Sequence, residues 1–157
     1  MKRILIVYYS RDGRNKKIAQ DLQRQLKCDI EEIIDLKNRH GWLAWCIAGF
    51  DVSYHRPTKI KELAQNPADY DLVIIGAPIW VGDLPPAIYA FINQYQDSLG
   101  TVAFYQCFGG GGDDKALAKF KAEIGSPLAH FVIRKANLET EEYQRKIDAF
   151  VKKIKEL

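Results

Sequence analysis

The stretch RILIVYYSRDGRNKKIA, residues 3–19, decides the fold. Residues 4–9 form a nearly unbroken apolar run, which is typical of a strand buried on both faces of a parallel sheet. A short polar loop ends the run, and the next apolar residues are spaced four apart, at Ile18, Leu22 and Leu26. This spacing predicts a helix. The loop therefore leads into a helix N-terminus, where free backbone N–H groups and the positive end of the helix dipole favour an anion such as phosphate.

The rest of the chain alternates in the same way. Further strands are predicted at residues 29–35, 71–77, 101–107 and 127–134. Helices are predicted from Pro86, from a cap at Asp113 or Asp114, and over residues 140–157. This alternation predicts an α/β fold, a parallel sheet in the order 2-1-3-4-5 with helices on both faces. In that topology ligands bind outside the carboxyl ends of strands 1, 3 and 4.

Composition narrows the class of protein. The 157 residues predict a single domain, 47% of them hydrophobic and 27% charged. The first residue leads directly into a strand, so we expect no signal peptide, and no apolar run approaches the roughly 20 residues of a transmembrane segment. The odd number of cysteines favours reduced thiols and a cytoplasmic location: Cys28, Cys46 and Cys107. No metal spacing and no basic stripe with interleaved aromatics, as in nucleic-acid binding, is present.

The loop after the first strand carries the first family signal. It reads Ser10, Arg11, Asp12, Gly13, Arg14 and Asn15. It resembles the phosphate loop of the flavodoxin family, in which Ser or Thr is followed by any residue, Thr, Gly, any residue and Thr. Asp12 and Asn15 stand where Thr is usual. The Asp12 carboxylate would either need a neighbouring cation beside a phosphate or cap the helix itself. Oxygen-independent protoporphyrinogen oxidases look similar here, with Arg-Asp-Gly in the same loop.

The loop after the third strand is aromatic. It contains Pro78, Ile79, Trp80, Val81 and Gly82. It looks like the flavodoxin loop whose aromatic residue stacks on the flavin, and this resemblance makes Trp80 the stacking candidate. The same resemblance implies that the Val81–Gly82 peptide reorients to accept a hydrogen bond from the reduced flavin. The alternative is a core tryptophan in a tight turn.

The loop after the fourth strand is rich in glycine. It contains Phe108, Gly109, Gly110, Gly111, Gly112 and Asp113. So many glycines favour a close approach of the backbone to a ligand or unusual dihedral angles; the alternative is a flexible loop without a ligand. Related short flavodoxin-like proteins have a similar loop with Thr and Ser where Cys107 and Phe108 stand. We expect Cys107 to be a small buried residue rather than a nucleophile.

The segment from Trp42 to Phe50 is apolar on almost every side and predicts a short helix. Three interpretations stay open. The helix packs into the core, because two tryptophans bury a large area. It forms a lid over the ligand or a dimer contact. It inserts shallowly at a membrane surface, with Arg56, Lys59 and Lys61 beside it.

Taken together, the loops indicate a flavodoxin-like three-layer sandwich that binds FMN non-covalently and transfers electrons. The partner would be a redox protein, a small quinone or NAD(P)H, and the protein a monomer or homodimer. The net charge of +3 favours acidic partners or an anionic surface. Two other functions stay open: a small FMN-dependent quinone or NAD(P)H oxidoreductase related to the protoporphyrinogen oxidases, and a binding module of this fold that has lost FMN.

Overall fold

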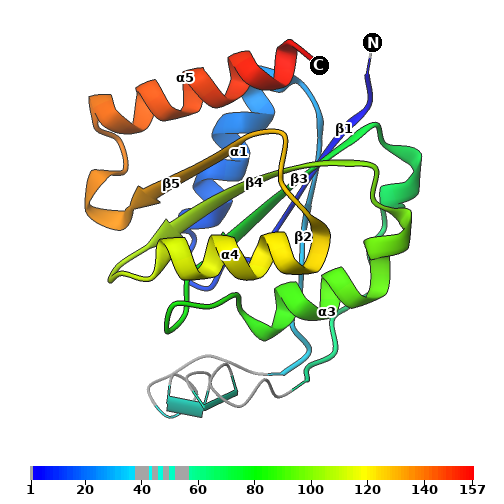
Figure 1. Cartoon of the computed structure of the whole chain (residues 1–157), viewed down its shortest axis with the longest axis vertical. Helices are drawn as coiled ribbons and strands as arrows, with labels where there is room; N and C mark the ends of the chain where they lie inside the picture. Colours follow the sequence, from blue (N-terminus) through cyan, green and yellow to red (C-terminus); the bar gives the residue numbers. More distant parts are fainter. Residues whose placement is uncertain (1, 38–42, 44–45, 48–49, 52–56) are drawn as a thin grey trace.

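A computed structural model describes residues 2–37, 43, 46–47, 50–51 and 57–157. Its centre is a parallel sheet of five strands in the order β2-β1-β3-β4-β5, as the sequence predicts (Figure 1). The strands are β1 (Ile4–Tyr8), β2 (Asp29–Glu32), β3 (Leu72–Pro78), β4 (Thr101–Phe108) and β5 (His130–Arg134). The expected edge position of β2 is confirmed.

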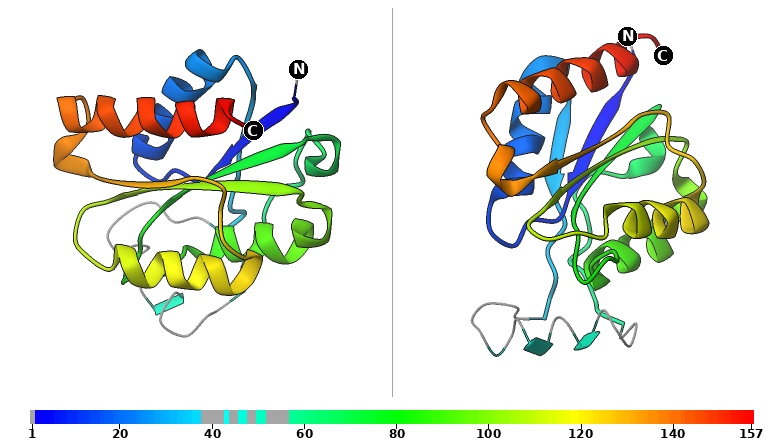
Figure 2. Two further views of the ribbon diagram at one scale, coloured as in Figure 1. Left: turned by 45° about the horizontal axis from the view of Figure 1, so that its top comes forward. Right: turned by 60° about the vertical axis from the view of Figure 1, so that its left-hand side comes forward.

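Helices cover both faces of the sheet (Figure 2). One face carries α1 (Arg14–Leu26) and α5 (Glu141–Lys155), and the other carries α3 (Pro86–Tyr95) and α4 (Asp113–Ile124). Short 3-10 turns lie at Pro67–Asp69, Gln96–Ser98 and Lys135–Asn137. The apolar side chains on the sheet-facing side of α5 are all buried: Tyr143, Ile147, Phe150, Val151 and Ile154.

Three predicted boundaries are wrong. The second strand ends at Glu32 rather than Asp35. The fifth strand starts at His130 rather than Pro127. The cap of α4 is Gly112 rather than Asp113 or Asp114, because the left-handed φ of +94° at Gly112 turns the chain into the helix. The two aspartates lie in the first helical turn, where the helix dipole favours negative charge.

A buried tyrosine joins three elements of the structure. Tyr105 on β4 is fully buried, and its hydroxyl donates a hydrogen bond of 2.8 Å to the backbone carbonyl of Asn15 in the first turn of α1. The ring crosses β3 at Gly76, where a Cβ atom would lie 2.1 Å from the ring. A glycine in this strand is therefore required by the close approach of a side chain from the next strand.

Between β2 and β3 the chain leaves the sheet at the lower end of the molecule in Figure 1. The described residues Leu43, Cys46, Ile47 and Phe50 are helical and exposed. The interpretation that this helix packs into the core is therefore wrong for the apolar side chains of Leu43, Ile47 and Phe50. Trp42 and Trp45, on which that interpretation rested, lie outside the described residues. In the part of the chain that the structure describes, no helix is both long and apolar enough to cross a bilayer.

Candidate functional site

The loop after β1 is arranged around the start of α1. Gly13 adopts a φ of +84° immediately before the helix. The Asp12 carboxylate accepts a hydrogen bond of 3.3 Å from the backbone N–H of Arg14 and forms an ion pair with the Arg14 guanidinium. Asp12 therefore takes one N–H group at the helix N-terminus, and Arg14 supplies the cation that the sequence calls for beside this carboxylate.

Two polar side-chain atoms of the same loop are buried without a hydrogen-bond partner among the described residues: Ser10 Oγ and Asn15 Oδ1. Asn15 is only 2% exposed. Buried polar atoms are costly when they lack partners, and in native proteins such atoms are usually satisfied by water, an ion or a ligand. These two atoms leave the loop with unused hydrogen-bonding capacity, a hydroxyl at Ser10 and an acceptor at Asn15.

The loop after β3 forms a tight hairpin turn. The backbones of Trp80 and Asp83 exchange two hydrogen bonds of 3.0 and 2.9 Å. Between them, Val81 and Gly82 have φ values of +53° and +73°, which is the pattern of a type I′ turn. Valine is β-branched and rarely adopts a positive φ, so the turn holds backbone strain at Val81.

Trp80 is half-buried at the base of this turn. Its ring makes an edge contact with Tyr9, with centroids 5.6 Å apart at an angle of 74°. The Arg11 guanidinium lies over the Trp80 ring, 5.6 Å from its centroid. Trp80 thus packs against the edge of the core and joins the aromatic loop to the loop after β1.

The glycine loop after β4 touches the aromatic turn backbone to backbone. A Cβ atom on Gly112 would lie 2.5 Å from the Cα atom of Gly82. A Cβ atom on Gly110 or Gly111 would meet open space, and one on Gly109 would meet the Lys135 side chain at 3.2 Å. The prediction of unusual dihedral angles is therefore confirmed at Gly112, whose backbone approaches that of Gly82. Gly110 and Gly111 have no such contact, and the close approach to a ligand stays a prediction.

The three loops meet around one cavity of about 460 Å³ at the carboxyl ends of β1, β3 and β4. Its lining includes the predicted residues Arg11, Asp12, Arg14, Asn15, Pro78, Ile79, Trp80, Phe108 and Gly109. Ser10 and Gly13 line an adjoining hollow of about 510 Å³, which shares Arg11 with the cavity. The remaining predicted residues line neither space: Val81, Gly82, Gly110, Gly111 and Asp113.

Two residues that the sequence does not predict for the site also line the cavity: Cys107 and Lys135. Burial raises the pKa of the Cys107 thiol to about 11, so the thiol is neutral at physiological pH, as expected for a small buried residue. Lys135 follows β5, and a cation at the carboxyl end of that strand is the signal that could have indicated it. Arg134, the last residue of β5, covers the Phe108 ring at 5.6 Å.

Charge in the cavity is predominantly positive. Arg11, Arg14 and Lys135 contribute three cations, and Asp12 contributes one carboxylate. A helix N-terminus adds further positive potential at the same place. The cavity is therefore suited to a ligand with an anionic group at one end and an apolar, flat group against the aromatic loop.

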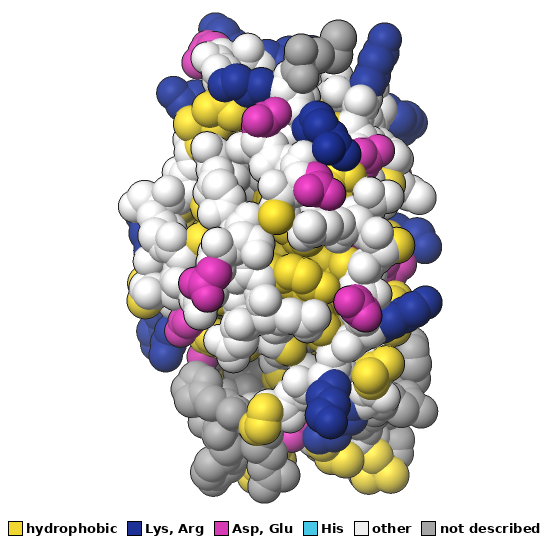
Figure 3. Space-filling view, turned by 90° about the vertical axis from the view of Figure 1, so that its right-hand side faces the viewer, with side chains coloured by type: hydrophobic (Ala, Val, Ile, Leu, Met, Phe, Trp, Pro, Cys, Tyr) yellow, Lys and Arg dark blue, Asp and Glu magenta, His cyan; other side chains and the backbone are white. Residues whose placement is uncertain are grey.

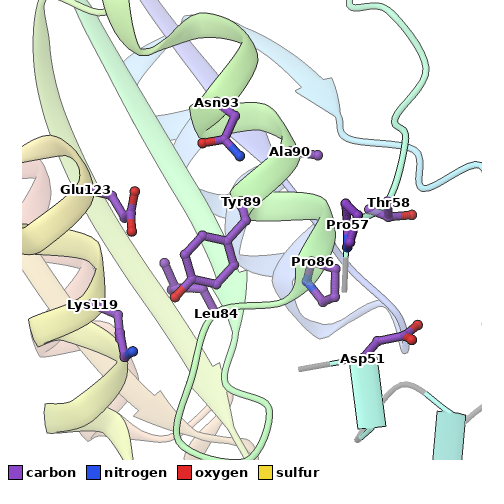
Figure 4. Close-up of a pocket in the computed structure, with 10 residues that line it drawn as sticks. All are labelled: Asp51, Pro57, Thr58, Leu84, Pro86, Tyr89, Ala90, Asn93, Lys119 and Glu123. Atoms are coloured by element: carbon purple, nitrogen blue, oxygen red, sulfur yellow. The ribbon is translucent and has the colours of Figure 1, made fainter. Parts of the chain in front are cut away.

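A different hollow of about 400 Å³ lies across α3 (Figure 4). Tyr89 extends from α3 towards α4, with Lys119 and Glu123 on the facing side. The Tyr89 hydroxyl donates a hydrogen bond of 2.6 Å to the Asp83 carboxylate, which also accepts one from the backbone N–H of Leu84. Tyr89 thus anchors the end of the aromatic turn from outside the cavity.

The doubly wound sheet, with a phosphate-type loop and an aromatic loop at its switch point, defines the flavodoxin-like class of proteins. A family model described as a flavodoxin domain, Flavodoxin_5, matches residues 50–157, and the chain belongs to this flavodoxin family. Among the curated proteins none matches the chain.

Solved structures show the same fold. The chain is similar to a flavoprotein in complex with FMN from Lactobacillus acidophilus, with a TM-score of 0.68 and 20% identity over 92% of this chain and 99% of that one. The apo-form of the L. acidophilus flavoprotein has a TM-score of 0.68 and is 21% identical over 90% of this chain and 99% of that one. Oxidised Flavodoxin 1 from Bacillus cereus has a TM-score of 0.63 and is 16% identical over 99% of both chains. At these identities the likeness concerns the fold.

Proposed function

We propose that this protein binds FMN non-covalently in the cavity of the three loops and acts in electron transfer. The observation that carries the proposal is the pair of buried, unsatisfied atoms Ser10 Oγ and Asn15 Oδ1 beside a cationic helix N-terminus. A phosphate group would satisfy Ser10 Oγ, because the hydroxyl can donate a hydrogen bond to it, and Arg11 and Arg14 can neutralise its charge. Asn15 Oδ1 is an acceptor, so it would need a donor such as a hydroxyl group of the same ligand.

The other end of the cavity fits the flat part of the same ligand. Trp80 would stack on the flavin ring, and the Phe108–Gly109 backbone would face the ring from the neighbouring loop. When bound, FMN supplies the redox chemistry. The residues of this chain would hold it and keep water from one side of the ring. The Val81–Gly82 peptide does not line the cavity, so it would have to turn towards the ligand to accept a hydrogen bond from it.

Asp12 is the residue that opposes this function. Its carboxylate occupies the Arg14 N–H group and shares the Arg14 guanidinium, so a phosphate must compete with it for both. In this proposal the ion pair lowers the affinity for FMN without closing the site, because the cavity also contains Arg11 and Lys135, which form no ion pair among the described residues.

The first experiment is an absorbance spectrum of the purified protein, followed by titration with FMN. We expect flavin bands that stay with the protein after the excess is removed. A protein that remains colourless and takes up no FMN would contradict the proposal and favour a binding module of this fold. Steady-state oxidation of NAD(P)H with a quinone by the FMN-loaded protein would instead favour the oxidoreductase function over a carrier that serves a redox partner protein.

Two variants test the residues assigned to the site. Trp80→Ala removes the stacking surface, and we expect FMN affinity to fall by about fivefold, since aromatic stacking is worth roughly 1 kcal/mol. Asp12→Thr frees the Arg14 N–H group and guanidinium, and we expect affinity to rise by a similar factor. Titration of flavin fluorescence measures both. Equal affinities in the two variants and the parent protein would refute the assignment.

A further inference from the structure

Large apolar side chains are exposed mainly at one end of this molecule. In the described part of the chain they are Ile34, Leu36, Leu43, Ile47, Phe50, Val81 and, at the other end, Leu157. All except Leu157 follow the carboxyl ends of β2 or β3, which lie at the same edge of a parallel sheet. In Figure 3 hydrophobic and basic side chains lie next to one another at the lower end of the molecule, and further basic side chains lie at the upper end.

The best-defined part of this surface is a short two-stranded ribbon. The backbone N–H of Leu36 donates to the Lys59 carbonyl, and that of Lys61 donates to the Ile34 carbonyl, both at 2.9 Å. Asp35 and Ile60 are directly opposite each other in this antiparallel bridge. Ile34 therefore faces Lys61, and Leu36 faces Lys59, with all four side chains on one face of the ribbon.

This face combines apolar surface with unpaired positive charge. Leu36 is 63% exposed, and Ile34, Lys59 and Lys61 are also exposed. Neither lysine forms an ion pair with any residue that the structure describes. On the opposite face of the ribbon, Ile60 packs against the core. We call the side chains of Ile34, Leu36, Lys59 and Lys61 the basic-apolar surface.

We propose that the basic-apolar surface docks on the surface of an anionic lipid bilayer. Lysines attract acidic lipid headgroups, while neighbouring apolar side chains enter the boundary between headgroups and acyl chains. The helical residues Leu43, Ile47 and Phe50, which follow the ribbon in the chain, add apolar side chains at the same end.

The charge and shape of the basic-apolar surface favour a lipid bilayer over a second copy of the chain and over a protein partner. A second copy of the chain, related by a two-fold axis, would bring the two lysines of one copy close to those of the other and be repelled. A protein partner would have to match projections from the ribbon and from Leu43, Ile47 and Phe50 at once. A bilayer is anionic and deforms around separate projections, so it needs no such match. The proposal is independent of FMN binding and extends beyond it.

Sedimentation with lipid vesicles tests the proposal on the purified full-length protein. We expect binding to phosphatidylcholine vesicles that contain about 30 mol% phosphatidylglycerol, and binding about tenfold weaker or more to phosphatidylcholine alone. Raising the salt from about 0.05 to 0.5 M should also release the protein. The result should be the same with and without added FMN. No binding to the phosphatidylglycerol vesicles would overturn the proposal and favour a protein partner.

Matched variants distinguish binding through the basic-apolar surface from non-specific adsorption to the vesicles. We expect Leu36→Asp and Lys59→Glu each to weaken vesicle binding by about tenfold. Leu157→Asp and Lys152→Glu, at the other end of the molecule, make the same chemical changes and should leave binding unchanged. Leu36 is exposed, so its variant should unfold at the same denaturant concentration as the parent. Equal effects of the two pairs, or a parent dimer that Leu36→Asp converts to a monomer, would overturn the proposal.

Discussion

The cavity has two ends that are held in different ways. At the anion end, residues 10–15, the Tyr105 hydroxyl reaches from the middle of the sheet to the Asn15 carbonyl, so the buried core fixes the loop. At the aromatic end, residues 78–82 and 108–112, Gly82 and Gly112 touch through their backbones, and the turn carries strain at an exposed valine. The anion end is thus rigid, whereas the aromatic end rests on a local contact.

Gly76→Ala perturbs the anion end, and we expect it to lower the free energy of unfolding more than the substitutions that follow. The new Cβ would lie 2.1 Å from the Tyr105 ring, which is fully buried in the core. We expect the free energy of unfolding to fall by about 3 kcal/mol, measured by chemical denaturation. Gly110→Ala, where a Cβ meets open space, is the control. Similar stability of the two variants would mean that Tyr105 does not brace this end.

Gly112→Ala perturbs the aromatic end. Its Cβ would overlap the Gly82 backbone, and its φ of +94° disfavours any residue with a Cβ. We expect a loss of about 2 kcal/mol, because backbone strain and overlap add but the loops are at the surface and can shift. Gly111→Ala provides the control, since it has no neighbour within contact distance. A loss as small as that of the control would show that the two loops do not depend on each other.

Tyr105→Phe tests the hydrogen bond alone. The ring and its packing are retained, and only the bond to the Asn15 carbonyl is lost. We expect unfolding to become easier by about 1 kcal/mol. Hydrogen exchange at the N–H groups of the first turn of α1 should become faster while exchange at the turn of residues 80–83 stays the same. Faster exchange at both places would refute the separation of the two ends.

Val81→Asn should have the smallest effect and the opposite sign. Asparagine followed by glycine is the favoured pair in a type I′ turn, and asparagine tolerates a positive φ. We expect a gain of roughly 0.5–1 kcal/mol in the free energy of unfolding, as strain is relieved at a 75% exposed position. Val81→Ile keeps the β-branched strain and serves as the control. A loss of stability in Val81→Asn would mean that the valine side chain makes a stabilising contact.

Much of the fold was predictable because it depends on local patterns. The apolar runs at residues 4–9 and 71–77 specify buried strands, and the spacing in residues 140–157 specifies the inner face of α5. The sheet order follows from the alternation of strands and helices. The cap of α4 was predicted wrongly because aspartate is the common cap residue and a glycine with a positive φ gives no side-chain signal.

The details of the site depend on contacts between distant residues. The polar loop, Trp80 and the glycine run could be identified by their positions after the strands. The contact between Gly82 and Gly112, and the position of Lys135 on the cavity, depend on how separate loops pack in three dimensions. No periodicity in a single sequence contains that information.

The bond between Tyr105 and Asn15 also sets an order of events during folding. It joins residues 90 positions apart, and it cannot form until β4 has docked beside β3. Closing so long a loop is entropically costly and slow compared with forming α1 from its own neighbours in sequence. Helix α1 can therefore form early, but the loop at its start becomes fixed only when the centre of the sheet is complete. A phosphate-bearing ligand would then meet its final binding geometry on a chain that has nearly finished folding.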